Sequence, residues 1–267
     1  MHDSQFHQLL DHFDYSWSGF RKVRKGIKKR LARHMQAVNC YNVDAYIAAI
    51  EKSDDVRQDF KHRMTVSISR FFRDRSLWDF LQDRMLPTLS QNSSPSIQIW
   101  FAGCAGGEEV YSFKILWEQI RNLHLRLPDL QILATDLNLD NLQRAQIAVY
   151  SQSSLREVSE KIRKHYFEKY SRGRYRLHSD FKKEIDWQIH DLLSEPPQSH
   201  FNLIFLRNNL LTYYVDSVKI PAFIQMTKSL LPGGFMIIGK HEKPPIETDF
   251  LKQFEESPFI YQAQLPI

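Results

Sequence analysis

Residues 97–112 read IQIWFAGCAGGEEVYS, and this stretch decides the fold. An apolar run at 97–101 has the composition of a buried strand, and a sequence typical of a helix begins after a loop of small residues. Gly103, Gly106 and Gly107 lie in that loop, where a glycine lets the backbone approach a ligand that a Cβ atom would exclude. The order of strand, glycine loop and helix predicts a ligand-binding turn at the carboxyl end of the strand.

The alternation of strands and helices continues along the rest of the chain. Strand-like apolar runs occur at 97–101, 130–135, 201–206 and 235–239, and helical stretches fall between them at 109–122, 139–150 and 215–230. Continuous apolar strands with intervening helices are typical of a parallel, doubly wound sheet. We therefore predict a Rossmann-like α/β domain over residues 76–267. Within it, the segment RYRLHSDFKKEIDWQIHDL (174–192) alternates apolar and polar residues, which predicts a small antiparallel β insertion at about 174–190.

The first 75 residues have helical patterns and no strand signal, so we predict an all-helical N-terminal domain over residues 1–75. Its segment RKVRKGIKKRLAR (21–33) has eight cations and no acid. Phe20, Val23, Ile27 and Leu31 recur at helical spacing, so the helix should pack through that stripe and present its cations outward. Both a solvated charged face and a docking surface for an acidic partner fit this pattern. The candidate docking residues are Arg21, Arg24, Lys25, Lys28, Lys29 and Arg33.

Composition narrows the functional class. The chain has 267 residues, of which 42% are hydrophobic, enough for a substantial core. Cys40 and Cys104 are the only cysteines and lack metal-ligand spacing, so we expect a reducing compartment and no metal. No stretch approaches the ~20 apolar residues of a membrane span, and we predict a cytoplasmic protein without membrane insertion. The net charge of +5 could suggest nucleic acid, but where the charge lies matters more than its total. We expect no nucleic-acid partner, and the cations at 21–33 leave a solvated face and an acidic protein partner both open.

The residues after the glycines indicate the chemistry of the ligand. A dinucleotide site would have GxGxxG and offer a helix N-terminus to pyrophosphate, whereas this loop is GxxGG followed by Glu108 and Glu109. Two carboxylates repel phosphate and suit a cation. S-adenosylmethionine carries a sulfonium and an ammonium and no phosphate. Asp136 ends the next strand in ATDLN, where it can accept hydrogen bonds from ribose hydroxyls. The predicted cofactor is therefore S-adenosylmethionine rather than NAD.

Six motifs then carry a family resemblance. Segments along nearly the whole chain resemble those of the CheR-type chemoreceptor glutamate methyltransferases. In order, they are DYSWSGFRKVRKGIKKRLARHM, MTVSISRFFRD, GCAGGEEVYS, ATDLN, FLRN and LPGGFMIIGKHE. The resemblance implies methyl transfer from S-adenosylmethionine to glutamates of an acidic helical receptor segment, by a monomer. It implies catalytic roles for Arg73, beside the acceptor carboxylate, and Tyr213. The implied cofactor contacts are Ser67, Ser69, Arg73, Gly103, Ala105, Glu108, Asp136, Leu137, Arg144, Asp191, Leu192, Arg207 and Asn208.

The chain also departs from the family pattern. Ser67 and Ser69 stand where the family often has Asn and Thr, and RNNLLTYY places Thr212 opposite the usual tyrosine, with Tyr213 one position later. Lys240 replaces the serine of the family's Ser-His-Glu. The family's inserted subdomain captures a receptor tether in some members, but those members carry more glycine than EKYSRGRYR does. These departures suggest a divergent branch whose acceptor need not be a chemoreceptor.

The chemistry of the implied reaction is simple. A glutamate with an ordinary pKa of ~4.3 is anionic at neutral pH and can attack a sulfonium methyl without a general base. Arg73 then has to orient the carboxylate rather than activate it. A methyltransferase of nucleic acid or a small molecule remains an alternative, although the Asn/Asp-Pro-Pro-aromatic motif of amino-methylating enzymes is replaced by LRNNLL. A non-catalytic module that binds S-adenosylmethionine also remains open.

Overall fold

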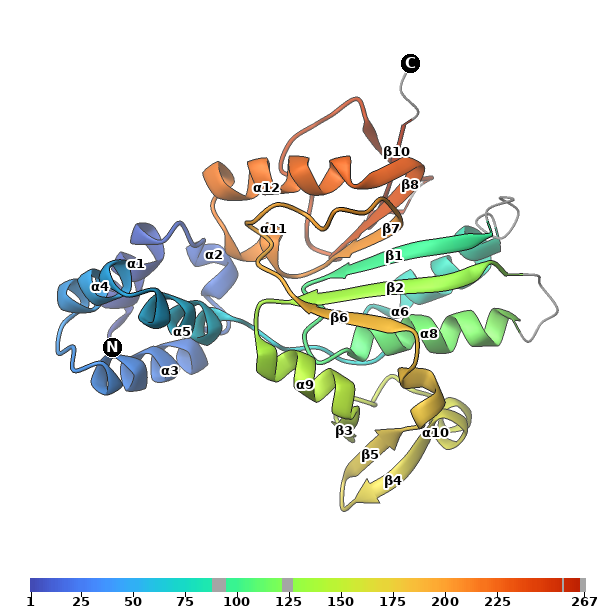
Figure 1. Cartoon of the computed structure of the whole chain (residues 1–267), viewed down its shortest axis with the longest axis horizontal. Coiled ribbons are helices and arrows are strands. Elements are labelled where there is room, and N and C mark those ends of the chain that lie inside the picture. Colours follow the sequence, from blue (N-terminus) through green and yellow to red (C-terminus); the bar gives the residue numbers. More distant parts are fainter. Residues whose placement is uncertain (88–94, 122–126, 256, 265–267) are drawn as a thin grey trace.

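The computed structural model describes residues 1–87, 95–121, 127–255 and 257–264. Figure 1 shows a group of helices near the N-terminus beside a larger part in which helices pack around a central sheet. The predicted fold class is confirmed: an all-helical N-terminal region precedes a Rossmann-like α/β domain that carries a small antiparallel sheet.

The helical region, residues 1–64, has its own core. Its helices are α1 (Asp3–His12), α2 (Trp17–Phe20), α3 (Arg24–Ala37), α4 (Val43–Lys52) and α5 (Asp54–Met64). The side-chain oxygens of Asn42 and Ser53 cap the N-termini of α4 and α5. Phe20, Leu31 and Phe60 are almost completely buried in one cluster that joins the five helices. The apolar stripe of the basic segment therefore packs inward, as predicted.

The second part is built on a seven-stranded sheet with the order β6-β2-β1-β7-β8-β10-β9. Its strands are β1 (Ser96–Ala102), β2 (Asp129–Asp136), β6 (Ile185–Ile189), β7 (Phe201–Leu206), β8 (Leu230–Ile238), β9 (Leu251–Gln253) and β10 (Ile260–Ala263). The first five strands in that order are parallel, and β10 and β9 extend the sheet antiparallel. The carboxyl ends of the parallel strands therefore meet at one edge, which faces the helical region in Figure 1.

Helices cover both faces of the sheet, as β1 illustrates. Ile99 and Phe101 belong to the cluster under α6 (Arg75–Phe80), α8 (Glu108–Arg121) and α9 (Leu139–Ile147). Trp100 and Ala102 belong to the cluster under α11 (Leu210–Tyr213) and α12 (Asp216–Lys228). Successive side chains of a strand point to opposite faces, so this division confirms the predicted doubly wound arrangement.

A linker joins the two parts. It runs from the end of α5 at Met64 to the start of α6 at Arg75, and α6 continues into one π-helical turn at Leu81–Met85. Phe71 and Phe72 of the linker are buried in the cluster that packs against the sheet. The domain boundary at residue 75 stays a prediction.

The predicted insertion at 174–190 is wrong in its second half. The small antiparallel sheet has the order β3-β5-β4 and consists of β3 (Val149–Ser151), β4 (Phe167–Ser171) and β5 (Arg174–Leu177), with α10 (Glu160–Tyr166) beside it. Only β5 falls in the predicted range. Strand β6, reached through a short 3-10 helix at Ser179–Lys182, pairs parallel with β2 and forms an edge of the main sheet. Its alternating pattern reflects an edge strand that is largely exposed on one face, not an antiparallel ribbon.

Candidate functional site

The main cavity lies where the carboxyl edge of the sheet meets the helical region. It encloses about 1030 Å3, part of which is open to solvent. Twelve of the residues predicted from the sequence line it: Ser67, Ser69, Arg73, Gly103, Ala105, Asp136, Leu137, Asp191, Leu192, Arg207, Asn208 and Tyr213. Glu108 and Arg144 line a second, separate cavity beside β3. The fold thus brings most of the separate motifs to one place, and the individual roles of these residues stay predictions.

Packing against neighbouring side chains and the backbone conformation both require glycine in the loop. A Cβ atom on Gly103 would lie 2.3 Å from Nδ2 of Asn209, and one on Gly106 would lie 2.1 Å from the guanidinium of Arg144. Gly103 and Gly107 also have a φ of 80°, in the left-handed region that favours glycine. These glycines therefore make room for neighbouring side chains and permit the turn that leads into α8.

Asp136 fastens the end of β2 to the glycine loop. Its Oδ2 accepts a hydrogen bond from Ala105 N at 2.9 Å, and its Oδ1 accepts from Asn138 N and from Asn141 Nδ2. Burial raises the pKa of this carboxyl, and the N–H donors oppose that rise. A carboxylate oxygen can accept two hydrogen bonds, so Oδ2 keeps one acceptor position for a ligand hydroxyl at the cavity wall.

The two glutamates after the glycines do not act as a pair. The expectation that Glu108 and Glu109 together offer a negative seat is corrected, because each faces its own arginine. Glu109 lines the main cavity and bonds to Arg207, whose other Nη lies 2.6 Å from Asp74. Glu108 is 2% exposed, its Oε1 is 3.6 Å from Arg144, and its Oε2 has no partner in the described part of the chain. Burial raises the pKa of Glu108.

Arg73 is held differently from the other cations of the cavity. Lys61 pairs with Asp191, and Arg207 has two carboxylates, but no carboxylate of the described residues lies within ion-pair distance of Arg73. Within the described part of the chain, its guanidinium makes one hydrogen bond, from Nη1 to the Ile68 carbonyl oxygen at 3.2 Å. Most of its donors therefore remain available to a ligand.

The backbone around Arg73 is tightly specified. Phe72 and Asp74 have φ values of 51° and 62°, a conformation that is costly for residues other than glycine. Ser112 Oγ accepts from Phe72 N at 2.9 Å, and Arg207 holds the Asp74 carboxylate. The contacts with Ser112 and Arg207 thus hold the residues on both sides of Arg73 in place. They thereby set the direction in which the Arg73 side chain leaves the backbone.

Sequence reasoning missed Glu242, which organises the end of β7. This carboxylate is 8% exposed, and its Oε2 accepts from Asn208 N at 2.8 Å and from Gly239 N at 2.7 Å. Thr212 Oγ1 donates to its other oxygen. Thr212 therefore supports the backbone of Asn208 and does not occupy a tyrosine's place in the cavity. The Glu of the family's Ser-His-Glu segment was a signal for this residue.

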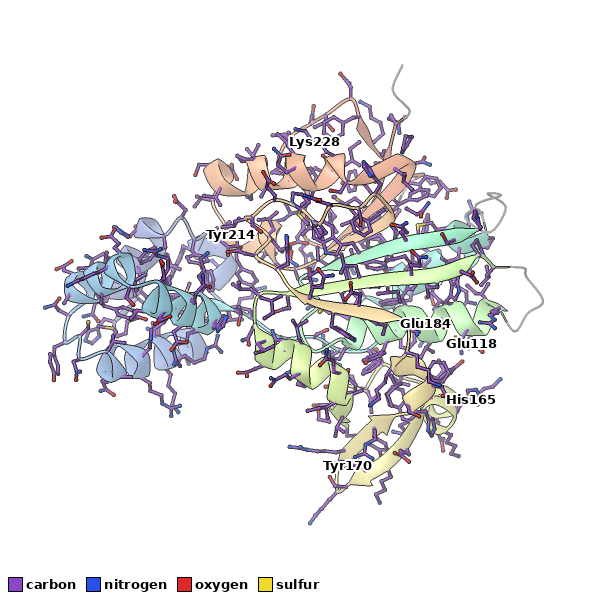
Figure 2. All side chains as sticks on the ribbon, viewed as in Figure 1. Glu118, His165, Tyr170, Glu184, Tyr214 and Lys228 are labelled. Carbon is purple, nitrogen blue, oxygen red and sulfur yellow. The ribbon has the colours of Figure 1, made fainter. Side chains whose placement is uncertain are left out.

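Other contacts around the cavity left no signal in the sequence. Asn141 Nδ2 donates to Asp136 and to Ser67 Oγ, which ties the linker to β2. Tyr15 and Tyr214 bring their rings to within 4.9 Å at the junction with the helical region, where Figure 2 labels Tyr214. Tyr213 packs on the ring of Phe20 with its side chain half-buried. These contacts join residues that are far apart in the sequence.

The basic helix is only partly free of acids. Asp3 of α1 lies 2.5 Å from Lys28 and 3.4 Å from Arg24, so two of the six candidate docking residues have a partner. Lys25, Lys29 and Arg33, which we call the basic row, are exposed and have no ion pair among the described residues. Their spacing of four residues places them on one face of α3. Arg21 is also exposed, just before the helix begins.

Two features are absent from the described residues. No group of three or more His, Cys, Asp and Glu side chains is arranged to hold a metal ion. No helix has the length and apolar character needed to cross a membrane.

Comparison with known proteins identifies the family. Residues 67–260 match the family model described as CheR methyltransferase, SAM binding domain. A chemotaxis protein methyltransferase of Listeria innocua is 31% identical over 218 residues, which cover 81% of this chain and 80% of that protein. One of Vibrio parahaemolyticus is 32% identical over 201 residues, covering 74% and 72%. The putative methyltransferase Cher3 of Pseudomonas putida is 28% identical over 235 residues, covering 85% and 84%.

Among solved structures, the N-methyltransferase NodS of Bradyrhizobium japonicum in complex with S-adenosylhomocysteine is 19% identical, with a TM-score of 0.35. The match covers 62% of this chain and 63% of NodS.

The fold, the site and the family match define an enzyme class, the S-adenosylmethionine-dependent methyltransferases with a Rossmann-like domain. Within that class, the chain belongs to the CheR methyltransferase family. Its cofactor is S-adenosylmethionine, and the main cavity fits that group chemically. Asp136 keeps an acceptor for a ribose hydroxyl, and Leu137 and Leu192 offer apolar surface to a base.

Proposed function

We propose that this chain transfers the methyl group of S-adenosylmethionine to glutamate side chains on an acidic helical segment of a receptor or signalling protein. The observation that carries the proposal is Arg73, the cavity cation that has no carboxylate partner among the described residues. A buried or half-buried arginine with free donors suits a carboxylate, which it can bind through two parallel hydrogen bonds. A nucleic-acid base offers no such anion.

The reaction requires positioning more than acid or base chemistry. S-adenosylmethionine supplies an electrophilic methyl group, and the acceptor carboxylate is already ionised at neutral pH. The task of the chain is to hold this carboxylate in line, which can contribute up to about 7–11 kcal/mol. Arg73 orients the acceptor, while the pairing of Arg207 with Asp74 and Glu109 keeps a second free cation from competing for it. Tighter binding of the acceptor carboxylate by a second cation would stabilise the ground state and slow the methyl transfer.

Acceptor recognition uses the basic row of α3. Three exposed, unpaired cations at helical spacing match the acids on one face of a partner helix. Long-range attraction of this kind raises the association rate and weakens as salt is added. The named relatives are chemotaxis methyltransferases, which supports a receptor or signalling protein as the acceptor. The cytoplasm as the location and a monomer as the working form are part of the same proposal.

The test is transfer of label from S-adenosylmethionine carrying a tritiated methyl group to membranes and cytosol of the source organism. We expect label on few proteins, released as methanol by mild alkali, because glutamyl methyl esters hydrolyse there and methylated amines do not. Mass spectrometry should place the methyl group on glutamates within a heptad-patterned helix. Alkali-stable label, or label on nucleic acid, would reject a carboxylate acceptor.

A further inference from the structure

One ion pair bridges the helical region and the sheet. Lys61 Nζ of α5 lies 2.6 Å from Asp191 Oδ2, just beyond the end of β6. The side chains are only 29% and 23% exposed, and both residues line the main cavity. Among the described residues, no other ion pair connects the helices of residues 1–64 to the part that begins at α6. The pair therefore stands at the one place where a charge contact can hold the two parts together across the cavity.

A backbone hydrogen bond orients the Asp191 carboxylate for this contact. Its Oδ1 accepts from Leu193 N at 3.1 Å, which leaves Oδ2 directed to Lys61. A partly buried pair with one member already oriented loses less side-chain entropy on forming than a pair of mobile surface side chains. No local pattern in the sequence indicates this partner, since Lys61 lies 130 residues before Asp191.

The same end of α5 is tied to the docking helix. Arg30 of α3 donates from Nε to the Arg63 carbonyl oxygen at 2.9 Å and from Nη2 to that of Thr65 at 2.7 Å. Any movement of Lys61 away from Asp191 therefore also moves the start of the linker and α3. The rest of the junction includes two backbone hydrogen bonds, in which Ser16 N donates to Tyr213 O and Val215 N donates to Asp14 O. It also includes the ring contacts of Tyr15 with Tyr214 and of Phe20 with Tyr213.

We propose that Lys61 is a positioning residue that holds the helical region closed over the main cavity, a role that rests on the function proposed above. The junction between residues 14–20 and 213–215, with its backbone and ring contacts, stays in place, and the pair of Lys61 with Asp191 is the contact that opens. Cofactor enters and leaves while this contact is broken. The closed form also holds the basic row at a fixed distance from Arg73.

The kinetics of ligand exchange separate this role from direct ligand contact. If the pair controls opening, its loss raises the open fraction of both the free and the loaded protein. Association and dissociation then accelerate by the same factor, and Kd changes little. If Lys61 instead contacts the ligand, its loss raises the dissociation rate and Kd and leaves the association rate unchanged.

The experiment measures association and dissociation of S-adenosylhomocysteine with the full chain by stopped-flow fluorescence. For Lys61→Met we expect both rates to rise about tenfold, with Kd within about twofold of the wild type. Lys61→Arg should restore wild-type rates. Lys183→Met is the matched control, because it removes a lysine 2.8 Å from Asp180 on the exposed surface outside the main cavity. Lys61→Gln, which keeps a side chain of similar length without the charge, tests the same pair if Lys61→Met does not fold.

Unchanged rates in Lys61→Met, or a raised Kd with an unchanged association rate, would overturn this role for Lys61 and leave the proposed function intact. Failure of the wild-type chain to bind S-adenosylhomocysteine would overturn both proposals.

Discussion

The basic row of α3 and the cations of the main cavity use the same kinds of side chain in opposite ways. Lys25, Lys29 and Arg33 are exposed and have no ion pair among the described residues. In the cavity, the side chain of Arg207 is 1% exposed and is held by two carboxylates. Arg73 is the exception there, since it is positioned by its flanking backbone and not by an acid.

This difference separates two tasks. Exposed, unpaired charges act at a distance and are screened by salt, so they suit capture of a partner. Buried, paired charges are costly to disturb and hold fixed positions, so they suit the alignment of reacting groups. The predictions below test whether the separation holds, beginning with the change that should cost most.

Loss of Arg207 should have the largest effect. Arg207→Met leaves the carboxylates of Asp74 and Glu109 without their cation, and we expect the free energy of unfolding to fall by about 3–5 kcal/mol in urea titrations. Arg57→Met is the matched control, because its pair with Asp54 has the same 2.6 Å distance but is exposed. That control should stay within about 1 kcal/mol of the wild type. Equal losses in the two variants would remove the contrast between buried and exposed cations.

Reversal of the basic row should have a smaller effect, confined to acceptor binding. With Lys25, Lys29 and Arg33 changed to Glu, we expect KM for the protein acceptor to rise about tenfold or more at low salt, with kcat nearly unchanged. The dependence of kcat/KM on ionic strength should become flatter. The control reverses Lys52, Lys161 and Lys228, exposed lysines on α4, α10 and α12 that have no ion pair in the described residues. If the control shifts KM equally, net charge and not the row attracts the acceptor.

Replacement of Glu108 should have the smallest effect, and it should stabilise the protein where loss of Arg207 destabilises it. Because burial raises its pKa, the charged form is disfavoured in the folded protein, and Glu108→Gln should raise Tm at neutral pH. For an acid with a raised folded pKa, the stability of the wild type recovers as pH falls and the carboxyl takes up a proton. The advantage of the Gln variant should therefore shrink in mildly acidic buffer. A Tm difference that is independent of pH would show that Glu108 does not titrate in this range.

The sequence predicted the features that depend on neighbours in the chain. The glycine loop, Asp136 and the parallel strands follow from local motifs and periodicity, and the structure places them together. Strand β6 shows where such reasoning ends. Its alternating pattern correctly indicated a strand, but periodicity does not name the partner strand, and β6 pairs with β2 and not with the small antiparallel sheet.

Contacts between distant residues were also out of reach of the sequence. Glu109 pairs with Arg207, Asp191 with Lys61, and Asn208 with Glu242. The two members of each pair are too far apart in the sequence for a local pattern to reveal the contact. Glu108 and Glu109 are adjacent in the sequence, which suggested one negative site, but adjacent residues at the start of a helix do not share a face. Neighbouring positions on a helix point about 100° apart, so the two carboxylates reach different arginines.

The central claim, that Arg73 orients the acceptor carboxylate and does not hold the cofactor, is tested most directly by single-turnover kinetics of Arg73→Ala. The account predicts a methyl-transfer rate lowered about a hundredfold, equivalent to about 2–4 kcal/mol, with the Kd for S-adenosylmethionine within about twofold of the wild type. Arg73→Lys should recover part of the rate but not all, because an ammonium cannot form the two parallel bonds of a guanidinium. Loss of cofactor binding in Arg73→Ala, or an unchanged transfer rate, would contradict the account.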